Sequence, residues 1–441
     1  MLLIYVDKLT NRLGYTIKLL FEDLLQVDYM VTTSREQFVA LGGAKLSYCE
    51  ERIYDEVHIS STNSILFETN IYSLDIDYVF EDGLHKIFRT YGNGDSLGFD
   101  IFSATFYMVS RYEEYLPFIR DEHQRFRAKD SIALQKGFLN KPVVNLWAKF
   151  LKQKLSEKYP DIEFVEKSFS FVNTIDVDQS YCYSHKNIFR TFGGFFRDIL
   201  SKRFDRCLQR IKVLLGFEKD PYDCFDYILQ TIMRYKTKTI FFFLFGNHTK
   251  YDKNISPYNH AFQMIVKNIS DYARVGIHPS YYSMEYPQEI HPQIKQMSAL
   301  IHKKITASRF HYLRFTLPQS YSDIIDNGIT SDYSMGYSDC IGFRAGICSP
   351  YNFYDLDKDC ETKLKIHPFM FMDVALKNGL KLSPDNVWQE IMYLIDEVKN
   401  VNGEFISLWH NESLSNNETW KGWRTIYDKQ LEYINSLIKQ I

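Results

Sequence analysis

The sequence lacks a long hydrophobic run. No apolar stretch approaches the roughly 20 residues that a membrane-spanning helix needs, and the run Ile240–Phe245 is only long enough for a buried strand. The first residues carry a short apolar run that Asp7 and Lys8 interrupt at once, without the basic leader and small-residue cleavage site of a secretory signal. We therefore expect a cytoplasmic protein without a transmembrane segment.

Paired cysteines and long basic blocks are also missing. The 7 cysteines are odd in number, scattered, and without a CxxC pair, which favours neither a disulfide framework nor a thiolate zinc site. Lys and Arg total 52 against 55 Asp and Glu, a formal charge of -3, so nucleic acid is not expected as a partner. Basic residues do cluster at 201–212, but acidic residues are interspersed, and we interpret this cluster as a solvated helix face.

Length and apolar content predict a globular chain of two domains. The 441 residues are 45% hydrophobic and 16% aromatic, ample for buried cores. At about 150 residues per domain, we place the first domain at 1–165 and the second at 166–441. Short β-type runs mixed with helical stretches predict an α+β first domain. The expected strands are Leu2–Val6, Lys45–Tyr48, Val57–Ile59 and Ile65–Phe67, and the expected helices Asp100–Tyr115 and Val143–Tyr159.

The second domain alternates predicted strands with predicted helices. This rhythm indicates an α/β architecture with a parallel sheet, either an open sheet or an irregular barrel. In both, polar residues at the carboxyl ends of strands gather at one edge. The strands are Phe169–Asp178, Thr239–Leu244, Val275–Ile277 and Phe405–Trp409, and the helices Pro221–Tyr235, Pro257–Tyr272, Pro287–Ile305 and Trp388–Val401.

Two acids end the first strand of the second domain. Residues two apart in a strand face the same side, so Asp176 and Asp178 project together. Adjacent carboxylates repel unless a cation or donor intervenes, which makes a metal an economical explanation. The alternative is that one acid caps the following helix while the other is solvated.

Three later strand-end or loop features add to these acids. Val275–Ile277 ends in His278, Phe405–Trp409 ends in His410, and Arg344 stands between glycines in Gly342-Phe343-Arg344-Ala345-Gly346. Each has a structural alternative, because a histidine can be a satisfied core residue and an arginine can simply pair with an acid. Their order along the chain nevertheless allows the acids and His278 to converge on one ion.

The order of these motifs resembles the polysaccharide deacetylases, the NodB-homology family of carbohydrate esterases. The series is Thr174-Ile175-Asp176-Val177-Asp178, Gly276-Ile277-His278, Gly342-Phe343-Arg344 and Leu408-Trp409-His410, and it spans about residues 168–441. A divergent bacterial branch with its own N-terminal domain is similar in three further runs. These are Asp332-Tyr333-Ser334-Met335-Gly336-Tyr337, Ser110-Arg111-Tyr112-Glu113-Glu114-Tyr115 and Asp121-Glu122-His123-Gln124-Arg125-Phe126.

The resemblance implies a distorted (β/α) barrel of polysaccharide-deacetylase type and a role for each motif. Asp176 would be the general base and Asp178 a metal ligand. His278 would be the first metal histidine and His410 the general acid. Arg344 would anchor near the base, and Asp373 would orient His410. The ion implied is a divalent metal, expected to be Zn²⁺.

One position departs from the family pattern. The second metal histidine should follow His278 by four residues, but Tyr282 stands there. His311 is the candidate replacement, because it lies in a polar strand-end segment after the His278 unit. Its alternative is a structural hydrogen bond.

The function that follows is metal-dependent removal of an acetyl or similar acyl group from a carbohydrate or a polysaccharide precursor. Tyr281, Tyr333, Tyr337 and Trp409 are candidates for stacking on sugar rings. The alternative is a catalytically degenerate carbohydrate-binding or scaffold protein, which the Tyr282 departure would permit. A metal-dependent phosphoesterase is disfavoured, because there is no Gly-rich phosphate loop and no dense Asp/His cluster. In the first domain, Asp121, His123 and Arg125 are interpreted as a salt-linked turn.

Overall fold

The computed structural model describes residues 1–61, 64–91 and 94–439. Its N-terminal segment contains a four-stranded sheet in the order β2-β1-β3-β4. These strands are β1 (Leu2–Val6), β2 (Tyr29–Thr32), β3 (Ala44–Cys49) and β4 (Val57–Ser60), with α1 (Asn11–Ile17), the π-helical η1 (Lys18–Leu24) and α2 (Arg35–Ala40) between the first three. All recorded pairings in this sheet are parallel.

The α+β prediction for this segment is therefore not confirmed. Helical crossovers after β1 and β2 allow parallel pairing, and the sequence reading missed β2 because it is short and mostly half-buried. Antiparallel pairing is found in the hairpin of β5 (Tyr78–Glu81) and β6 (Leu84–Ile87). The strand predicted at 65–67 is wrong: Ser64–Leu66 forms a turn of 3₁₀ helix, closed by a bond from Phe67 N–H to Ser64 O of 2.8 Å.

Helices complete this segment. They are α3 (Ile101–Val109), the 3₁₀ turns η3 (Tyr112–Glu114) and η4 (Ala128–Asp130), α4 (Ile132–Gln135) and α5 (Val143–Lys158). The single helix predicted at 100–115 ends early. Arg111 adopts a left-handed conformation (φ 56°), which stops α3 and starts η3.

The second half contains a nine-stranded sheet in the order β12-β13-β11-β10-β9-β8-β7-β15-β14. All recorded pairings in this sheet are parallel except β12 with β13. Its strands are β7 (Ser170–Val177), β8 (Lys238–Leu244), β9 (Arg274–His278), β10 (Ala307–Ser308), β11 (Ser331–Asp332), β12 (Tyr351–Asp355), β13 (Cys360–Ile366), β14 (Phe371–Met372) and β15 (Glu404–His410).

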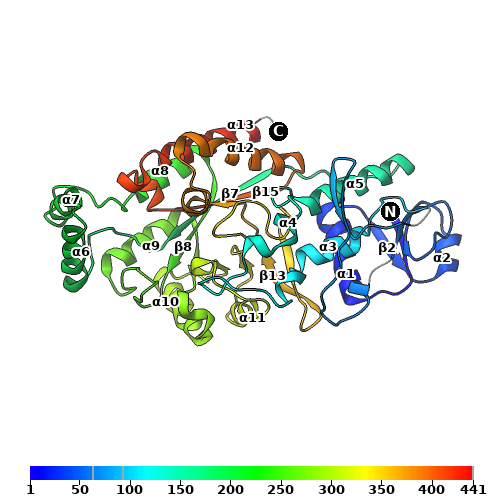
Figure 1. The fold of residues 1–441 in the computed structure, drawn as a ribbon, viewed down its shortest axis with the longest axis horizontal. Helices are drawn as coiled ribbons and strands as arrows, with labels where there is room; N and C mark the ends of the chain where they lie inside the picture. The colour runs from blue at the N-terminus through cyan, green and yellow to red at the C-terminus, as the bar shows by residue number, and fades with distance from the viewer. Residues whose placement is uncertain (62–63, 92–93, 440–441) are drawn as a thin grey trace.

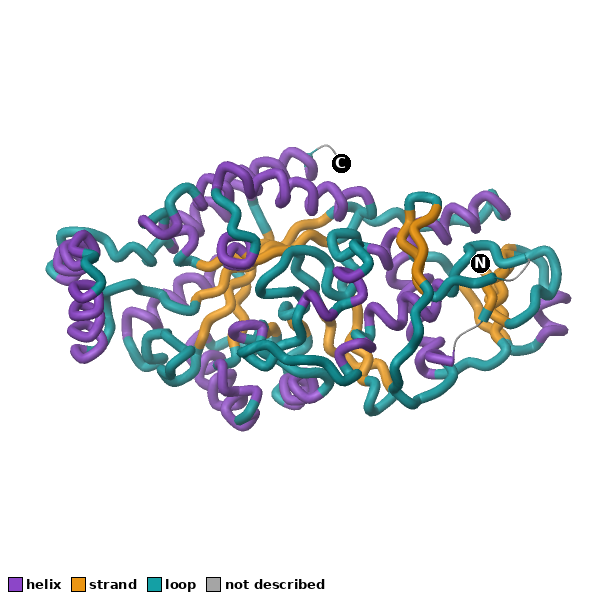
Figure 2. Tube along the Cα trace, in the orientation of Figure 1, coloured by secondary structure: helices purple, strands orange, loops and turns teal. Residues whose placement is uncertain are grey.

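Helices lie outside these strands, as Figures 1 and 2 show. The α-helices are α6 (Ile188–Leu200), α7 (Phe204–Leu214), α8 (Phe225–Tyr235), α9 (His260–Tyr272), α10 (Ile290–Ile301), α11 (Gln319–Asp326), α12 (Pro384–Asn400) and α13 (Trp423–Ile438). The α/β architecture with a parallel sheet is confirmed.

The strands follow one another as in a (β/α) barrel, but a closed barrel is not seen. Among the described residues, no pairing connects the β12–β13 end of the sheet to β14. The N-terminal segment packs against that end. Arg12 pairs with Asp359 at 2.8 Å, and the Tyr15 hydroxyl donates to Asn352 O at 2.7 Å. An open sheet edge is thereby covered from within the same chain.

Candidate metal centre

The carboxyl end of β7 supplies the two acids. Buried apolar residues at 171, 172, 175 and 177 fix this strand between β15 and β8. Asp176 of β7 pairs with His410 of the neighbouring strand β15. Its side chain is buried, and Oδ1 accepts a hydrogen bond from Arg309 Nη1 at 2.8 Å. Asp178 follows the strand and turns toward two histidines. Of the two predicted strand-end acids, Asp176 therefore binds mainly Arg309, while Asp178 faces His278 and His311.

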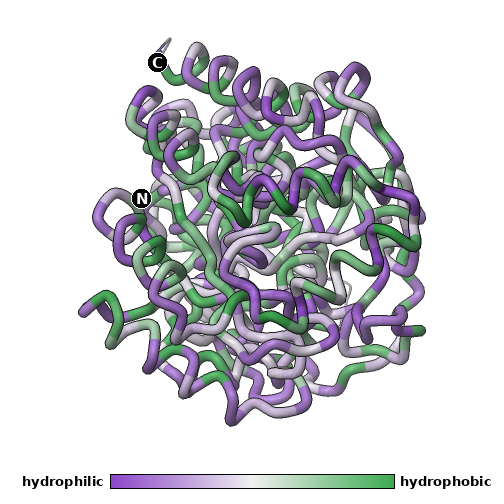
Figure 3. Tube along the Cα trace, turned by 90° about the vertical axis from the view of Figure 1, so that its left-hand side faces the viewer, coloured by the Kyte–Doolittle hydropathy of each residue, from purple (hydrophilic) through white to green (hydrophobic). Residues whose placement is uncertain are grey.

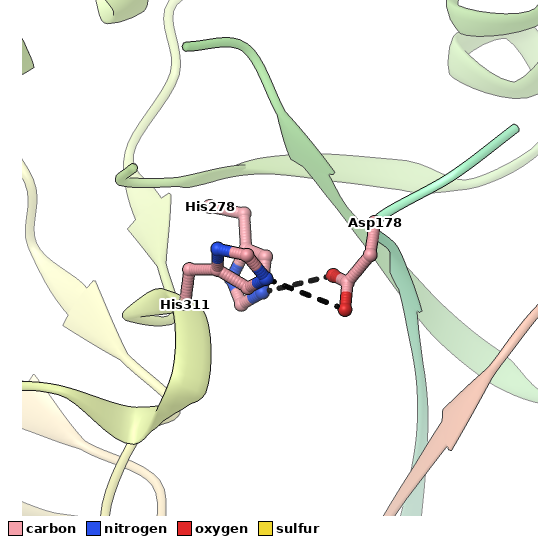
Figure 4. Close-up of side chains that lie close together, drawn as sticks. All are labelled: Asp178, His278 and His311. Atoms are coloured by element: carbon pink, nitrogen blue, oxygen red, sulfur yellow. Dashed lines mark ion pairs between the residues drawn. The ribbon is translucent and has the colours of Figure 1, made fainter. Parts of the chain in front are cut away.

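Three predicted ligands converge in space (Figure 4). His278 ends β9, and His311 begins the 3₁₀ turn η7 (His311–Leu313) after β10. Their Nε2 atoms lie 3.3 and 3.4 Å from the two carboxylate oxygens of Asp178. One ligand atom from each residue lies within 4.8 Å of the others. His311, from the segment after β10, thus lies where a second histidine ligand could act, although Tyr282 stands at the position four residues after His278.

A second set of contacts orients the two imidazoles. His278 Nδ1 bonds the carbonyl oxygen of Arg309, and His311 Nδ1 lies 2.8 Å from Asp252 Oδ1. Asp252 also accepts bonds from Tyr281 N–H (2.9 Å) and Thr249 Oγ1 (2.8 Å). When Nδ1 is engaged in this way, Nε2 presents its lone pair to a metal. Asp252 was not predicted, because it lies in the loop eight residues beyond the end of β8 and not at the strand end itself.

The residues present fit a divalent cation. One carboxylate and two imidazoles are a donor set that suits Zn²⁺, and Asp178 Oδ1 is buried without a hydrogen-bond partner among the described residues. Burial acts to raise the pKa of Asp178, but His311 and His278 hold it well below its usual range. Burial acts to lower the pKa of His311, but Asp178 and Asp252 raise it to about 9. The negative charge that raises the pKa of His311 would also favour a bound cation at this position.

His410 and Asp373 form a separate pair at the same edge. His410 Nδ1 lies 2.7 Å from Asp373 Oδ1, and the His410 backbone N–H donates to Oδ2 at 2.7 Å. His410 Nε2 points to the ligand set, 3.8 Å from Asp178 Oδ2. Burial acts to lower the pKa of His410, but Asp373 raises it well above its ordinary value.

These groups line a cavity of about 580 Å³. Its walls include Asp176, Asp178, His278, His311, His410, Glu412, Tyr251, Tyr312 and Trp420, together with Glu122, His123 and Arg125 of the N-terminal segment. The aromatic residues predicted to stack on sugars are largely buried, with Trp409 0% and Tyr333 1% exposed. Tyr251, Tyr312 and Trp420 face the cavity in their place.

Comparisons with known proteins give low similarity. Residues 2–160 match a family of unknown function (DUF7033), and no curated protein matches the chain. A crystal structure assigned as a polysaccharide deacetylase from Mycobacterium smegmatis is 12% identical with a TM-score of 0.41, and the match covers 62% of this chain and 86% of the other. One with the same assignment, from Pseudomonas aeruginosa PAO1, is 10% identical with a TM-score of 0.37, covering 60% and 85%.

A CE4 family pseudoenzyme from Bacillus anthracis is also similar. It is 12% identical with a TM-score of 0.30, and the match covers 60% of this chain and 62% of the other. Likeness at this level does not identify an activity, which has to come from the geometry of the site.

Arg344 lies elsewhere than the sequence reading expected. Its guanidinium donates to both carboxylate oxygens of Glu114, at 2.9 and 2.7 Å. Arg111 binds the same carboxylate at 2.7 Å. Because Glu114 engages this guanidinium, Arg344 joins the two halves of the chain, and the arginine beside Asp176 is Arg309.

Arg309 was not predicted, because its partners come from distant segments of the chain. It follows β10, is fully buried, and donates to Tyr333 O, Thr174 Oγ1 and Asp176 Oδ1, each at 2.8 Å. The predicted salt-linked turn is present at Asp121, whose carboxylate accepts the N–H groups of His123 and Arg125 and the Arg125 side chain.

Proposed function

We propose that the chain is a metal-dependent hydrolase that removes an acetyl or similar acyl group from a carbohydrate. The observation that carries the proposal is the convergence of Asp178, His278 and His311 inside a cavity, around a buried carboxylate oxygen that has no hydrogen-bond partner in the described part of the chain. A divalent cation bound there, with Zn²⁺ as the expected ion, would supply Lewis acidity to a water molecule and to the acyl carbonyl.

Asp176 is the proposed general base. Arg309 holds its Oδ1, while Oδ2 lies 3.8 Å from His278 Nε2, beside the ligand set. A carboxylate oriented in this way can take a proton from the attacking water. Arg309 thus acts through Asp176 as a positioning residue.

His410 is the proposed general acid. Asp373 fixes its Nδ1 and raises its pKa above the ordinary value, which favours the protonated ring that a general acid needs. Nε2 can then donate a proton to the departing amine or alcohol, a contribution of roughly 10²–10⁴-fold in rate. Ser413 and the His410 backbone N–H also bond to Asp373 and hold this carboxylate in place.

A carbohydrate substrate is supported by the lining of the cavity. Tyr251, Tyr312 and Trp420 offer aromatic surfaces for sugar rings. Glu122, His123 and Arg125 add groups that can bond hydroxyls.

Elemental analysis of the full-length protein tests the proposal. We expect near-stoichiometric divalent metal in the wild type, its loss in Asp178→Ala, His278→Ala and His311→Ala, and acetate release from acetylated oligosaccharides that follows the metal. His367→Ala is the matched control, because His367 also bonds a carboxylate through Nδ1, Glu404 at 2.9 Å, yet lies outside the ligand set.

A wild type that binds no metal after reconstitution would overturn the hydrolase. The alternative, a carbohydrate-binding or scaffold protein without metal chemistry, would then take its place. Its support is the tyrosine at 282.

A further inference from the structure

Helices α6 and α7 form a hairpin at the end of the molecule opposite the N-terminal segment (Figure 1). They pack on each other through polar residues and glycine. Arg210 of α7 pairs with Asp198 of α6, and a Cβ atom at Gly194 would meet the Arg210 guanidinium at 2.7 Å. The hairpin has its own small apolar cluster at its base, formed by Cys182, Tyr183 and Val213.

The outer face of α6 is apolar and exposed. Phe189, Phe192, Phe196 and Leu200 follow one another at three- and four-residue spacing, which places them on one side of the helix. Their exposed fractions are 87%, 60%, 63% and 84%. Asp198 and Gly194, which face α7, lie on the other side by the same periodicity.

Helix α7 repeats this arrangement. Phe204, Leu208, Ile211 and Leu215 recur at the same spacing and are exposed, while Cys207, Arg210 and Val213 are buried. Figure 3 turns this end of the molecule toward the viewer. Exposed apolar residues that gather on one element, unlike single scattered ones, mark an interaction surface.

The charges around these stripes are mostly positive. Residues 188–217, all described, contain seven basic and two acidic side chains, and one of the acids, Asp198, is buried against Arg210. Arg197, Lys202 and Arg203 are exposed around the link between the helices. Phenylalanine and leucine on one face with basic residues beside them are the pattern of helices that lie in a lipid–water interface.

We propose that the α6–α7 hairpin docks the protein on the surface of an anionic phospholipid bilayer. The apolar stripes enter the headgroup region, and the basic residues pair with lipid phosphates. A second copy of the chain fits less well, because a two-fold interface would bring the same positive surface against itself. The proposal is independent of the metal site.

Vesicle flotation with the full-length protein tests the docking. We expect the wild type to float with vesicles of phosphatidylcholine and phosphatidylglycerol and to bind phosphatidylcholine vesicles far less. The Phe192→Ser/Phe196→Ser variant should partition at least about tenfold more weakly. Its matched control is Phe80→Ser/Tyr54→Ser, two exposed aromatic residues of the N-terminal segment, of which Phe80 is 59% exposed.

The charge requirement is tested separately. An Arg197→Gln/Lys202→Gln/Arg203→Gln variant should lose about tenfold or more of the binding to anionic vesicles. Added salt should weaken wild-type binding in the same direction. Circular dichroism and the Tm of each variant establish that the chain remains folded.

Three outcomes would overturn the proposal. They are no flotation of the wild type with anionic vesicles, equal flotation with both vesicle types, and equal loss in the Phe192/Phe196 variant and its control. Light scattering tests whether a second copy of the chain, and not a bilayer, covers this face. A wild-type dimer that becomes monomeric in the Phe192/Phe196 variant, without vesicle binding, would assign the face to a second copy.

Discussion

Two buried arginines, Arg309 and Arg344, separate the chemistry of the site from the packing that surrounds it. Arg309 binds Asp176, the proposed base, while Arg344 binds Glu114 of the N-terminal segment. The sequence favoured Arg344, because the family resemblance implies an arginine near the base at this position. Only the fold decides which guanidinium reaches the carboxylate at the end of β7.

Substitution of Arg309 should lower the rate of catalysis, whereas substitution of Arg344 should lower the stability of the fold. Arg309→Gln should lower kcat by about 10²-fold with little change in KM, because it releases the carboxylate that receives the proton. Arg344→Gln should lower the free energy of unfolding by about 3–5 kcal/mol, since it leaves Glu114 buried with one cation fewer. Kinetics on the acetylated glycan and denaturant titrations measure the two effects. A large kcat loss in a stable Arg344→Gln variant would reverse the assignment.

Lys186, in the loop before α6, should make the free energy of unfolding depend on pH. Burial lowers its pKa to about 8. The unfolded chain therefore binds more protons than the folded chain between about pH 8 and the ordinary lysine value, so this residue's contribution to stability rises with pH across that window. The free energy of unfolding of the wild type relative to Lys186→Met should increase from pH 7 to pH 10. A pH-independent difference would contradict the depressed pKa.

At the scale of elements, the loop at residues 116–127 forms part of the cavity wall. His123 Nδ1 lies 3.0 Å from the Tyr281 hydroxyl, Arg125 donates to Tyr312 O at 2.8 Å, and Arg314 donates to His123 O at 3.0 Å. These bonds bring a segment of the N-terminal half over the carboxyl ends of β7, β9 and β10. We infer that this loop contacts the substrate.

Removal of the His123 ring should therefore alter binding more than chemistry. His123→Ala should raise KM severalfold with metal content and kcat near the wild-type values, because the ring lies in the cavity wall outside the Asp178–His278–His311 set. His85→Ala in the β5–β6 hairpin is the control. An unchanged KM would exclude the loop from the substrate site, and lost metal would indicate a structural role.

On the scale of the whole molecule, the two halves share one core. A single apolar cluster extends from Leu2 to Leu437, and ion pairs such as Arg12–Asp359 and Arg344–Glu114 cross between the halves. No described helix has both the length and the apolar character needed to cross a membrane.

Because the two halves share this core, we expect them to unfold together. Calorimetry of the full chain should give one thermal transition whose calorimetric and van't Hoff enthalpies agree, because neither half can lose its packing alone. Two resolved transitions would show that the interface between the halves is energetically minor.

The sequence predicted the half that holds the candidate site better than the surfaces around it. Strand-end polar residues could be found because hydrophobic strands such as β7, β8, β9 and β15 have sharp ends, and parallel packing gathers those ends. Arg309 and Asp252 could not be found, because their roles depend on which loops approach each other. The parallel N-terminal sheet was missed through the short strand β2. The sequence analysis described only residues 201–212 as a solvated helix face, and the exposed apolar face of α6 lay outside its predictions.

The proposed metal ligands come from the carboxyl ends of β7 and β9 and from the turn after β10. An ion held by all three would act as a cross-link between segments up to 133 residues apart, from Asp178 to His311. Such a link slows local opening of the strands that it joins. Amide exchange at β7 and β9 would then report whether an ion occupies the site, with no substrate present.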